Sequence, residues 1–196
     1  LHRKFIDYGQ DDLGDVKLNY GGRMYGRWCN LSDLQRKMLT LNGDETIELD
    51  LEASTVNIMY KNISDAKYQE GDPYYLSIDG KVIPRHIVKQ ASTIMLSTGS
   101  IIAATSALMN HYTPRLDEWI KDNRSKEKKE KAKEYVEIVS VIKPSVIMKA
   151  FLQKHIFIKE FYLKGKKMGD YVACMESDRV FEIIKQLTEK SIPVLT

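Results

Sequence analysis

The sequence contains little cysteine and no long apolar run. Its 196 residues include two cysteines, Cys29 and Cys174, too few for a disulfide framework or a zinc cluster. Such a content is typical of a reducing intracellular compartment, so we expect a cytoplasmic protein. No apolar stretch approaches the roughly 20 residues of a membrane span, and the N-terminal residues lack the apolar core of a signal peptide. We therefore expect a globular protein with no membrane partner.

The motifs of several common enzyme classes are also missing. There is no GxxxxGK[ST] loop, which argues against a P-loop nucleotidase, and no GxGxxG motif after a strand pattern. There is no GxSxG elbow of the α/β-hydrolase type. The four histidines have no metal-ligand spacing with one another or with the cysteines, which argues against a zinc site. Candidate sites must therefore be sought among carboxylates, cations and aromatic side chains.

The chain is weakly basic, with a formal net charge of +3. Residues 121–134 hold seven basic and four acidic residues, and this surplus of three positive charges equals the net charge of the whole chain. Such a segment either contacts phosphates or forms a solvated helix or linker, and mixed charges favour the second interpretation. The chain begins at Leu1 and ends in the apolar run IPVLT. We therefore expect it to be a fragment of a longer protein.

Periodicity and turn residues predict an α+β fold that is mostly helical. Asn-Gly at 42–43 predicts a turn, and SIDGKVIP (77–84) predicts a small hairpin. Helical spacing and start and stop signals predict helices at 30–39, 52–62, 84–99, 100–121 with an interruption near Pro114, 144–165 and 170–190. Alternation and apolar runs predict a small antiparallel sheet that contains 46–50 and 192–196.

Asp50 lies near the end of the predicted strand TIELDL, with Glu52 two residues later. An aspartate at this place has two interpretations. It can cap the helix that follows, or it can coordinate magnesium for phosphoryl transfer, because a strand end mounts a carboxylate rigidly. On its spacing alone, the cap is the commoner of the two.

Two groups of cations are candidates for binding anions. Arg85 and Lys89 lie four residues apart in a predicted helix, so both side chains share one face, where they repel unless an anion lies beside them. A nucleoside triphosphate is such an anion, and two solvated surface charges are the alternative. Arg23, Tyr25 and Arg27 belong to the stretch GGRMYGRW, which suits either a nucleic-acid strand or the edge of a core.

Four stretches follow one another along the chain: GGRMYGRWCNLSDLQRKML, ETIELDLEASTVNIMY, GDPYY and PRHIVKQASTIMLSTGS. Taken in this order, they resemble the palm and fingers of family A DNA polymerases. The resemblance is closer to divergent relatives of that family that phages and mobile elements encode. It spans most of residues 20–196, and the order and spacing of the motifs support it better than any single motif does.

The resemblance implies a role for each candidate residue. Asp50 occupies the place of the metal-binding aspartate of motif A, and Arg85 and Lys89 that of the motif B cations that contact the triphosphate. Arg36 resembles the basic residue before motif A. Asp72-Pro73-Tyr74 resembles a short motif between A and B. Thr55 stands where the family has a bulky glutamate that excludes a ribose 2′-hydroxyl, so the resemblance leaves the sugar preference open.

The implied activity is template-dependent addition of nucleotides to a DNA or RNA primer with two Mg²⁺ ions. Motif C, which holds the second carboxylate, is expected after Thr196, so we expect this fragment to be inactive unless a further segment or chain completes it. The implied organisation is a basic and aromatic segment (1–45), a palm segment (46–83), a fingers segment (84–143) and helices returning to the palm (144–196). Two alternatives stay open: a non-catalytic nucleic-acid-binding protein on a polymerase scaffold, and a protein-interaction domain.

Overall fold

The computed structural model describes residues 2–6, 20–63, 71–121 and 126–194. The chain divides into two compact units. Unit 1 combines both ends of the chain, Leu1–Ile58 and Asp170–Thr196, and unit 2 is the continuous stretch Met59–Gly169. Within the described part of the chain, no helix is long and apolar enough to cross a membrane.

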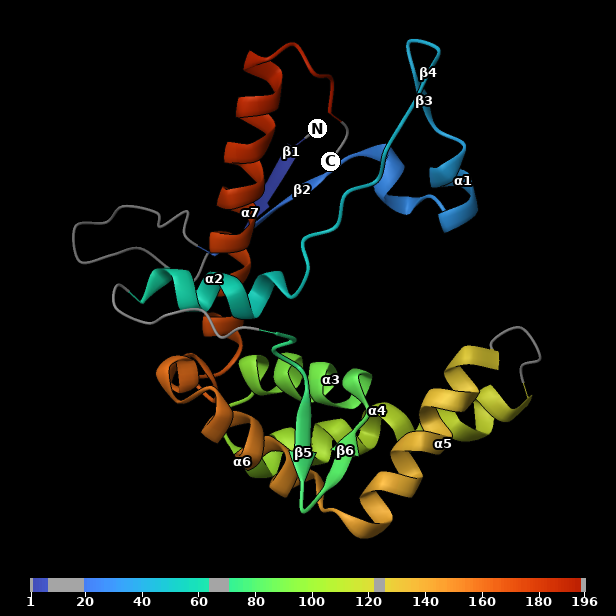
Figure 1. Cartoon of the computed structure of the whole chain (residues 1–196), viewed down its shortest axis with the longest axis vertical. Coiled ribbons are helices and arrows are strands. Elements are labelled where there is room, and N and C mark those ends of the chain that lie inside the picture. The colour runs from blue at the N-terminus through green and yellow to red at the C-terminus, as the bar shows by residue number, and fades with distance from the viewer. Residues whose placement is uncertain (1, 7–19, 64–70, 122–125, 195–196) are drawn as a thin grey trace. The chain divides into compact units, whose positions relative to one another are not determined.

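Unit 1 is built around an antiparallel hairpin and a long helix (Figure 1). The hairpin pairs β1 (His2–Phe5) with β2 (Gly21–Tyr25). It lies beside α7 (Lys166–Glu189), where the Ser177 hydroxyl donates to the Gly22 carbonyl and the Arg3 guanidinium pairs with Asp178 at 2.6 Å. Gly21 and Gly22 both have φ of +73°, a conformation that favours glycine.

A short helical and hairpin segment follows β2 in unit 1. The 3-10 helix η1 (Arg27–Asn30) leads to α1 (Asp33–Lys37), which begins with a capping box between Ser32 and Gln35. The strands β3 (Thr40–Leu41) and β4 (Asp44–Glu45) then enclose the Asn-Gly turn. Both turn residues have positive φ, as a type I′ turn requires. The predicted turn is confirmed, and the helix predicted at 30–39 is present but limited to residues 33–37.

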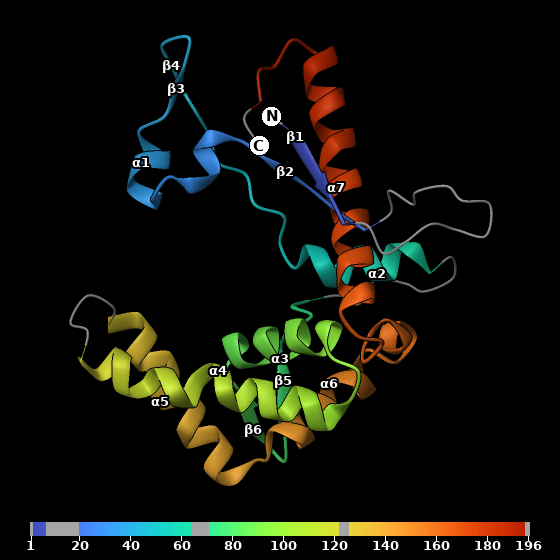
Figure 2. The ribbon, with the colours of Figure 1, turned by 180° about the vertical axis from the view of Figure 1, so that it is seen from behind.

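The described residues of unit 2 form helices and one hairpin, in which β5 (Leu76–Ile78) and β6 (Lys81–Ile83) are joined by an Asp-Gly turn. Helices α3, α4 and α6 pack on one another, α5 packs on α4, and β5 contacts α6 (Figures 1 and 2). Their buried side chains include Ile87, Met95, Leu108, Met148 and Phe151. The helices are α3 (Arg85–Ser97), α4 (Ile101–Lys121), α5 (Lys126–Val141), α6 (Pro144–Lys154) and the 3-10 helix η2 (Ile156–Phe161).

The mostly helical α+β fold with small antiparallel sheets is confirmed, but the described residues of the two segments assigned to the predicted sheet form no strand. Neither 46–50 nor 192–194 is a strand, and residues 195–196 of the second segment lie outside the described residues. A strand requires hydrogen bonds to a neighbour, and within the described residues the segment 46–50 has no ladder partner. Its apolar side chains Ile47 and Leu49 are 86% and 83% exposed. The segment is an extended connection that leads into α2 (Ser54–Asn62).

Some of the predicted helices also differ from the structure in their extent or continuity. The helix predicted at 144–165 ends at Lys154, because His155 leaves the helical region with φ of −105° and ψ of 46°, and η2 follows. The interruption predicted near Pro114 is absent, since α4 continues through this residue. In the charged segment, residues 126–134 form the first part of α5, which agrees with the solvated-helix interpretation.

Candidate functional site

The exposed face of α3 presents the two predicted cations together. Pro84 precedes the helix with φ of −52°, a value preset by its ring, and α3 begins at Arg85. The opposite face buries Ile87, Val88, Ala91 and Met95 in the core of unit 2. Arg85 and Lys89 lie one turn apart on the exposed side. The predicted helix is therefore confirmed, and its amphipathic pattern directs both cations outwards.

Arg85 is held in place by the turn before β5. Its Nε donates to Asp72 Oδ2 at 2.8 Å, and its Cζ lies 5.2 Å from the centroid of the Tyr74 ring. The other carboxylate oxygen, Asp72 Oδ1, accepts from the Tyr74 backbone N–H at 3.0 Å. The Arg85 side chain nevertheless stays 45% exposed. The guanidinium is therefore oriented by its Nε, and among the described residues no hydrogen bond or ion pair occupies its two terminal nitrogens, which can donate to a ligand.

Lys89 differs from Arg85 in its surroundings. The Lys89 side chain is exposed, and it makes no hydrogen bond or ion pair with the described residues. The backbone carbonyl of Lys89 accepts from the Thr93 hydroxyl. Asp72 thus pairs with Arg85, whereas Lys89, one helical turn further along α3, has no carboxylate partner among the described residues. The local excess of positive charge favours an anion such as a phosphate chain.

The same turn is anchored by the end of α6. Lys154 Nζ donates to three carbonyls, those of Asp72 at 3.1 Å, Pro73 at 3.2 Å and Tyr75 at 2.6 Å. Burial lowers the pKa of Lys154, and the charge of Asp72 opposes this effect. The buried His155 adds a fourth contact, from Nε2 to the Pro73 carbonyl at 2.8 Å.

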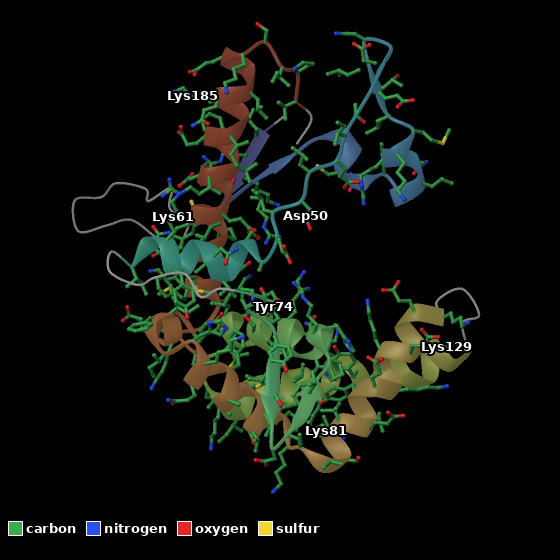
Figure 3. All side chains as sticks on the ribbon, viewed as in Figure 1. Asp50, Lys61, Tyr74, Lys81, Lys129 and Lys185 are labelled. Carbon is green, nitrogen blue, oxygen red and sulfur yellow. The ribbon has the colours of Figure 1, made fainter. Side chains whose placement is uncertain are left out.

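The remaining predicted residues belong to unit 1. Asp50 is exposed on the extended segment before α2 (Figure 3), and among the described residues it makes no hydrogen bond or ion pair. Since α2 begins only at Ser54, the interpretation of Asp50 as its N-cap is wrong. Arg36 donates to Glu48 Oε1 at 3.0 Å and to the Leu31 carbonyl at 2.9 Å, so in this structure it joins α1 to the extended segment.

Thr55 is half-buried in the first turn of α2. The hydroxyl of its neighbour Ser54 donates to Glu176 of α7, and Arg23 Nη2 lies 3.8 Å from the other oxygen of this carboxylate. Arg23 is 66% exposed. Tyr25 ends β2, and Arg27 begins η1. Glu176 is thus the carboxylate that links β2, α2 and α7 within unit 1.

The described residues do not by themselves fit a site for two magnesium ions. No group of three or more His, Cys, Asp or Glu side chains within them is arranged to hold a metal. Asp50 offers a single exposed carboxylate, whereas a two-metal site needs several oxygen ligands. The predicted metal role of Asp50 therefore requires further ligands.

Sequence reasoning did not identify Lys154, His155 or Glu176 as parts of these arrangements. Lys154 and His155 lie 79 to 82 residues along the chain from the turn that they hold, and no local pattern marks such a contact. A lysine followed by a histidine at the end of an amphipathic helix is the one signal available.

Comparison with protein-family models, with curated proteins and with solved structures returns no match. Any functional assignment therefore rests on the residues themselves.

Proposed function

We propose that this chain is a polymerase-like nucleotidyltransferase module that binds a nucleoside triphosphate at Arg85 and Lys89. The supporting observation is the exposed face of α3, where both cations stand within the first two helical turns and a carboxylate orients one of them. Terminal guanidinium nitrogens and a free ammonium match phosphate oxygens. The start of the helix adds partial positive charge in the same region.

The proposed reaction transfers a nucleotidyl group to the 3′ end of a DNA or RNA primer. The oxygen of the primer 3′-hydroxyl forms a bond to the α-phosphorus and releases its proton to solvent water, while the bond between the α-phosphorus and the leaving pyrophosphate breaks. Negative charge grows on the leaving group, and Arg85 and Lys89 stabilise this charge electrostatically. Arg36 is proposed as a supporting cation, and Asp50 as a metal ligand within a more complete site. The stretch with Arg23, Tyr25 and Arg27 would hold template or primer.

Nucleotide binding tests the α3 site directly. The single variants Arg85→Gln and Lys89→Gln should each weaken binding of a fluorescent nucleoside triphosphate about 10- to 100-fold, the range expected for loss of one charge-assisted contact. Titrations followed by fluorescence anisotropy measure this change. Lys81→Gln is the matched control, because Lys81 is an exposed cation on β6 of the same unit. Equal weakening by the control would point to general electrostatic attraction instead.

Primer extension by the full-length protein with Mg²⁺ tests the catalytic part of the proposal. Asp50→Asn keeps the size of the side chain and removes its charge, so extension should fall roughly 100-fold or more if the carboxylate stabilises the transition state. Reactions with deoxyribonucleotides and ribonucleotides would also define the sugar preference at Thr55. Extension that survives Asp50→Asn would refute the metal role of this residue.

A protein-interaction domain is the second candidate, and one observation favours it. Ile47 and Leu49 expose most of their surface on an extended segment with no strand partner within the described residues. Such a segment can accept a partner strand. Three results together would support this candidate over the first: the protein does not bind nucleotides, it does not extend primers, and the Ile47→Ser variant differs from the wild type in oligomeric state.

A further inference from the structure

The ammonium group of Lys154 contacts the backbone of one turn. An ammonium has three N–H donors, and Lys154 Nζ lies within hydrogen-bond distance of three carbonyl oxygens, those of Asp72, Pro73 and Tyr75. All three acceptors belong to the turn between Gly71 and β5. Lys154 therefore acts on this turn, in contrast to the exposed ammonium of Lys89.

His155 holds the same turn through a defined tautomer. Its Nε2 lies 2.8 Å from the Pro73 carbonyl, which can only accept, so Nε2 carries the proton. Nδ1 then accepts from the Tyr60 hydroxyl at 3.0 Å. The imidazole is fully buried and packs on Phe151 with ring centroids 4.5 Å apart. Both ring nitrogens are thus used, and the ring is fixed on α2, α6 and the turn together.

The turn in question carries the groups that orient Arg85. Asp72 uses one oxygen for the Tyr74 N–H and the other for Arg85 Nε. The Tyr74 ring lies under the guanidinium and stacks on Phe151 at 6.4 Å between centroids. The position of the Arg85 guanidinium therefore depends on the position of the turn, and the turn depends on Lys154 and His155.

We propose that Lys154 and His155 are positioning residues for the phosphate-binding Arg85. They fix the turn at residues 72–75 so that Asp72 takes the Nε of Arg85 and leaves both terminal nitrogens to the triphosphate. The ligand class is a nucleoside triphosphate, so the inference rests on the proposed function. Neither residue touches the nucleotide itself.

A double-mutant cycle tests this role. Lys154→Met keeps the length of the side chain and removes its donors, and it should weaken binding of a fluorescent ATP analogue with Mg²⁺ roughly tenfold. In the Arg85→Gln background the same substitution should have almost no further effect, because the group that it positions is gone. Lys149→Met, an exposed lysine on the same helix, is the matched control and should bind as the wild type does.

A second readout does not require nucleotide binding. The NMR signal of Arg85 Nε–H should exchange slowly in the wild type, because Asp72 accepts from it, and should exchange quickly in Lys154→Met and His155→Gln. Unchanged exchange in both variants would overturn the inference, as would equal loss of binding by Lys154→Met in both backgrounds. If the wild-type protein binds no nucleotide, the proposed function and the role of this turn in it are refuted. If the Arg85 Nε–H nevertheless exchanges slowly in the wild type and quickly in Lys154→Met, the experiment would still establish that Lys154 positions Arg85.

Discussion

His155 is a histidine whose ionisation is tied to the core of unit 2. Burial is the main cause that lowers its pKa, the neighbouring charge of Lys154 acts in the same direction, and the hydrogen bond to Pro73 opposes both. The Nε2–H tautomer satisfies both neighbours only when the ring is neutral. Protonation would place a charge between a hydroxyl and a backbone carbonyl, neither of which carries a compensating negative charge.

A pH dependence of stability follows from this environment. An unfolded histidine has a pKa near 6.5, and the folded value is lower, so below that pH the unfolded chain takes up a proton that the folded chain does not. The free energy of unfolding should therefore be highest above about pH 7 and should fall on acidification towards the folded pKa. Each tenfold difference in proton affinity corresponds to about 1.4 kcal/mol. Urea unfolding at about pH 7.5 and about pH 5.5, on either side of the unfolded pKa, measures the effect.

The control for this prediction must separate the contribution of His155 to the pH dependence from that of His86. Burial also lowers the pKa of His86, although its hydrogen bond to the Lys131 carbonyl and the charge of Glu134 oppose the change. His155→Asn should reduce the loss of stability between the two pH values, and a double variant that adds His86→Asn should reduce it further. An unchanged loss in His155→Asn would show that other groups cause the pH dependence.

At the scale of single residues, the sequence predicted the two cations of α3 better than the residues that hold them in place. The spacing of Arg85 and Lys89 predicts a shared face because helical geometry is local and regular. The partner of Arg85 was also within reach, since Asp72 lies 13 residues earlier in a recognisable turn. Lys154 could not be found in this way, because its acceptors are backbone carbonyls, which every residue has.

Among the elements, the β1–β2 hairpin depends on a glycine with close neighbours. A Cβ at Gly22 would lie 2.8 Å from Arg3 Nη2 and 2.9 Å from Phe5 Cε1, and φ is +73°. Gly22→Ala should therefore destabilise unit 1 by about 2 kcal/mol or more, the sum of backbone strain and steric displacement. Thermal unfolding followed by circular dichroism measures the loss.

A second glycine supplies the matched control for this variant. Gly43 also has a positive φ, +94°, but a Cβ there would meet no atom within 4 Å. Gly43→Ala should cost only the backbone strain of about 1 kcal/mol. If both substitutions have the same effect, the close packing at Gly22 contributes nothing to stability.

Local signals explain why some elements were predicted correctly and others were not. The Asn-Gly and Asp-Gly turns and the Ser32–Gln35 capping box act within a few residues, so their sequence patterns are sufficient. The strand predicted at 46–50 required a partner far along the chain, and alternation cannot supply one. The end of α6 at Lys154 likewise depends on the distant contacts of His155.

At the scale of the whole molecule, the mostly helical α+β class was predictable, but the division into two units was not. Unit 1 joins residues from both ends of the chain, and no composition shift marks Ile58 or Asp170 as a boundary. The two units also differ in their cores. Of the buried apolar side chains that the structure describes, unit 1 contributes Val56, Ile58, Val172 and Cys174, and unit 2 contributes the others.

This difference predicts that unit 2 folds without unit 1. Its core comes from one continuous stretch of chain, so no distant segment is needed to complete it. A fragment of residues 54–175, which keeps α2 whole and the first turns of α7, should show a helical circular dichroism spectrum and one cooperative thermal transition. In the fragment, Phe151→Ala should lower stability by about 3–5 kcal/mol, as expected for a fully buried aromatic side chain. A fragment that melts without cooperativity would show that unit 2 requires the chain ends, and nucleotide binding by a folded fragment would locate the triphosphate site within unit 2 alone.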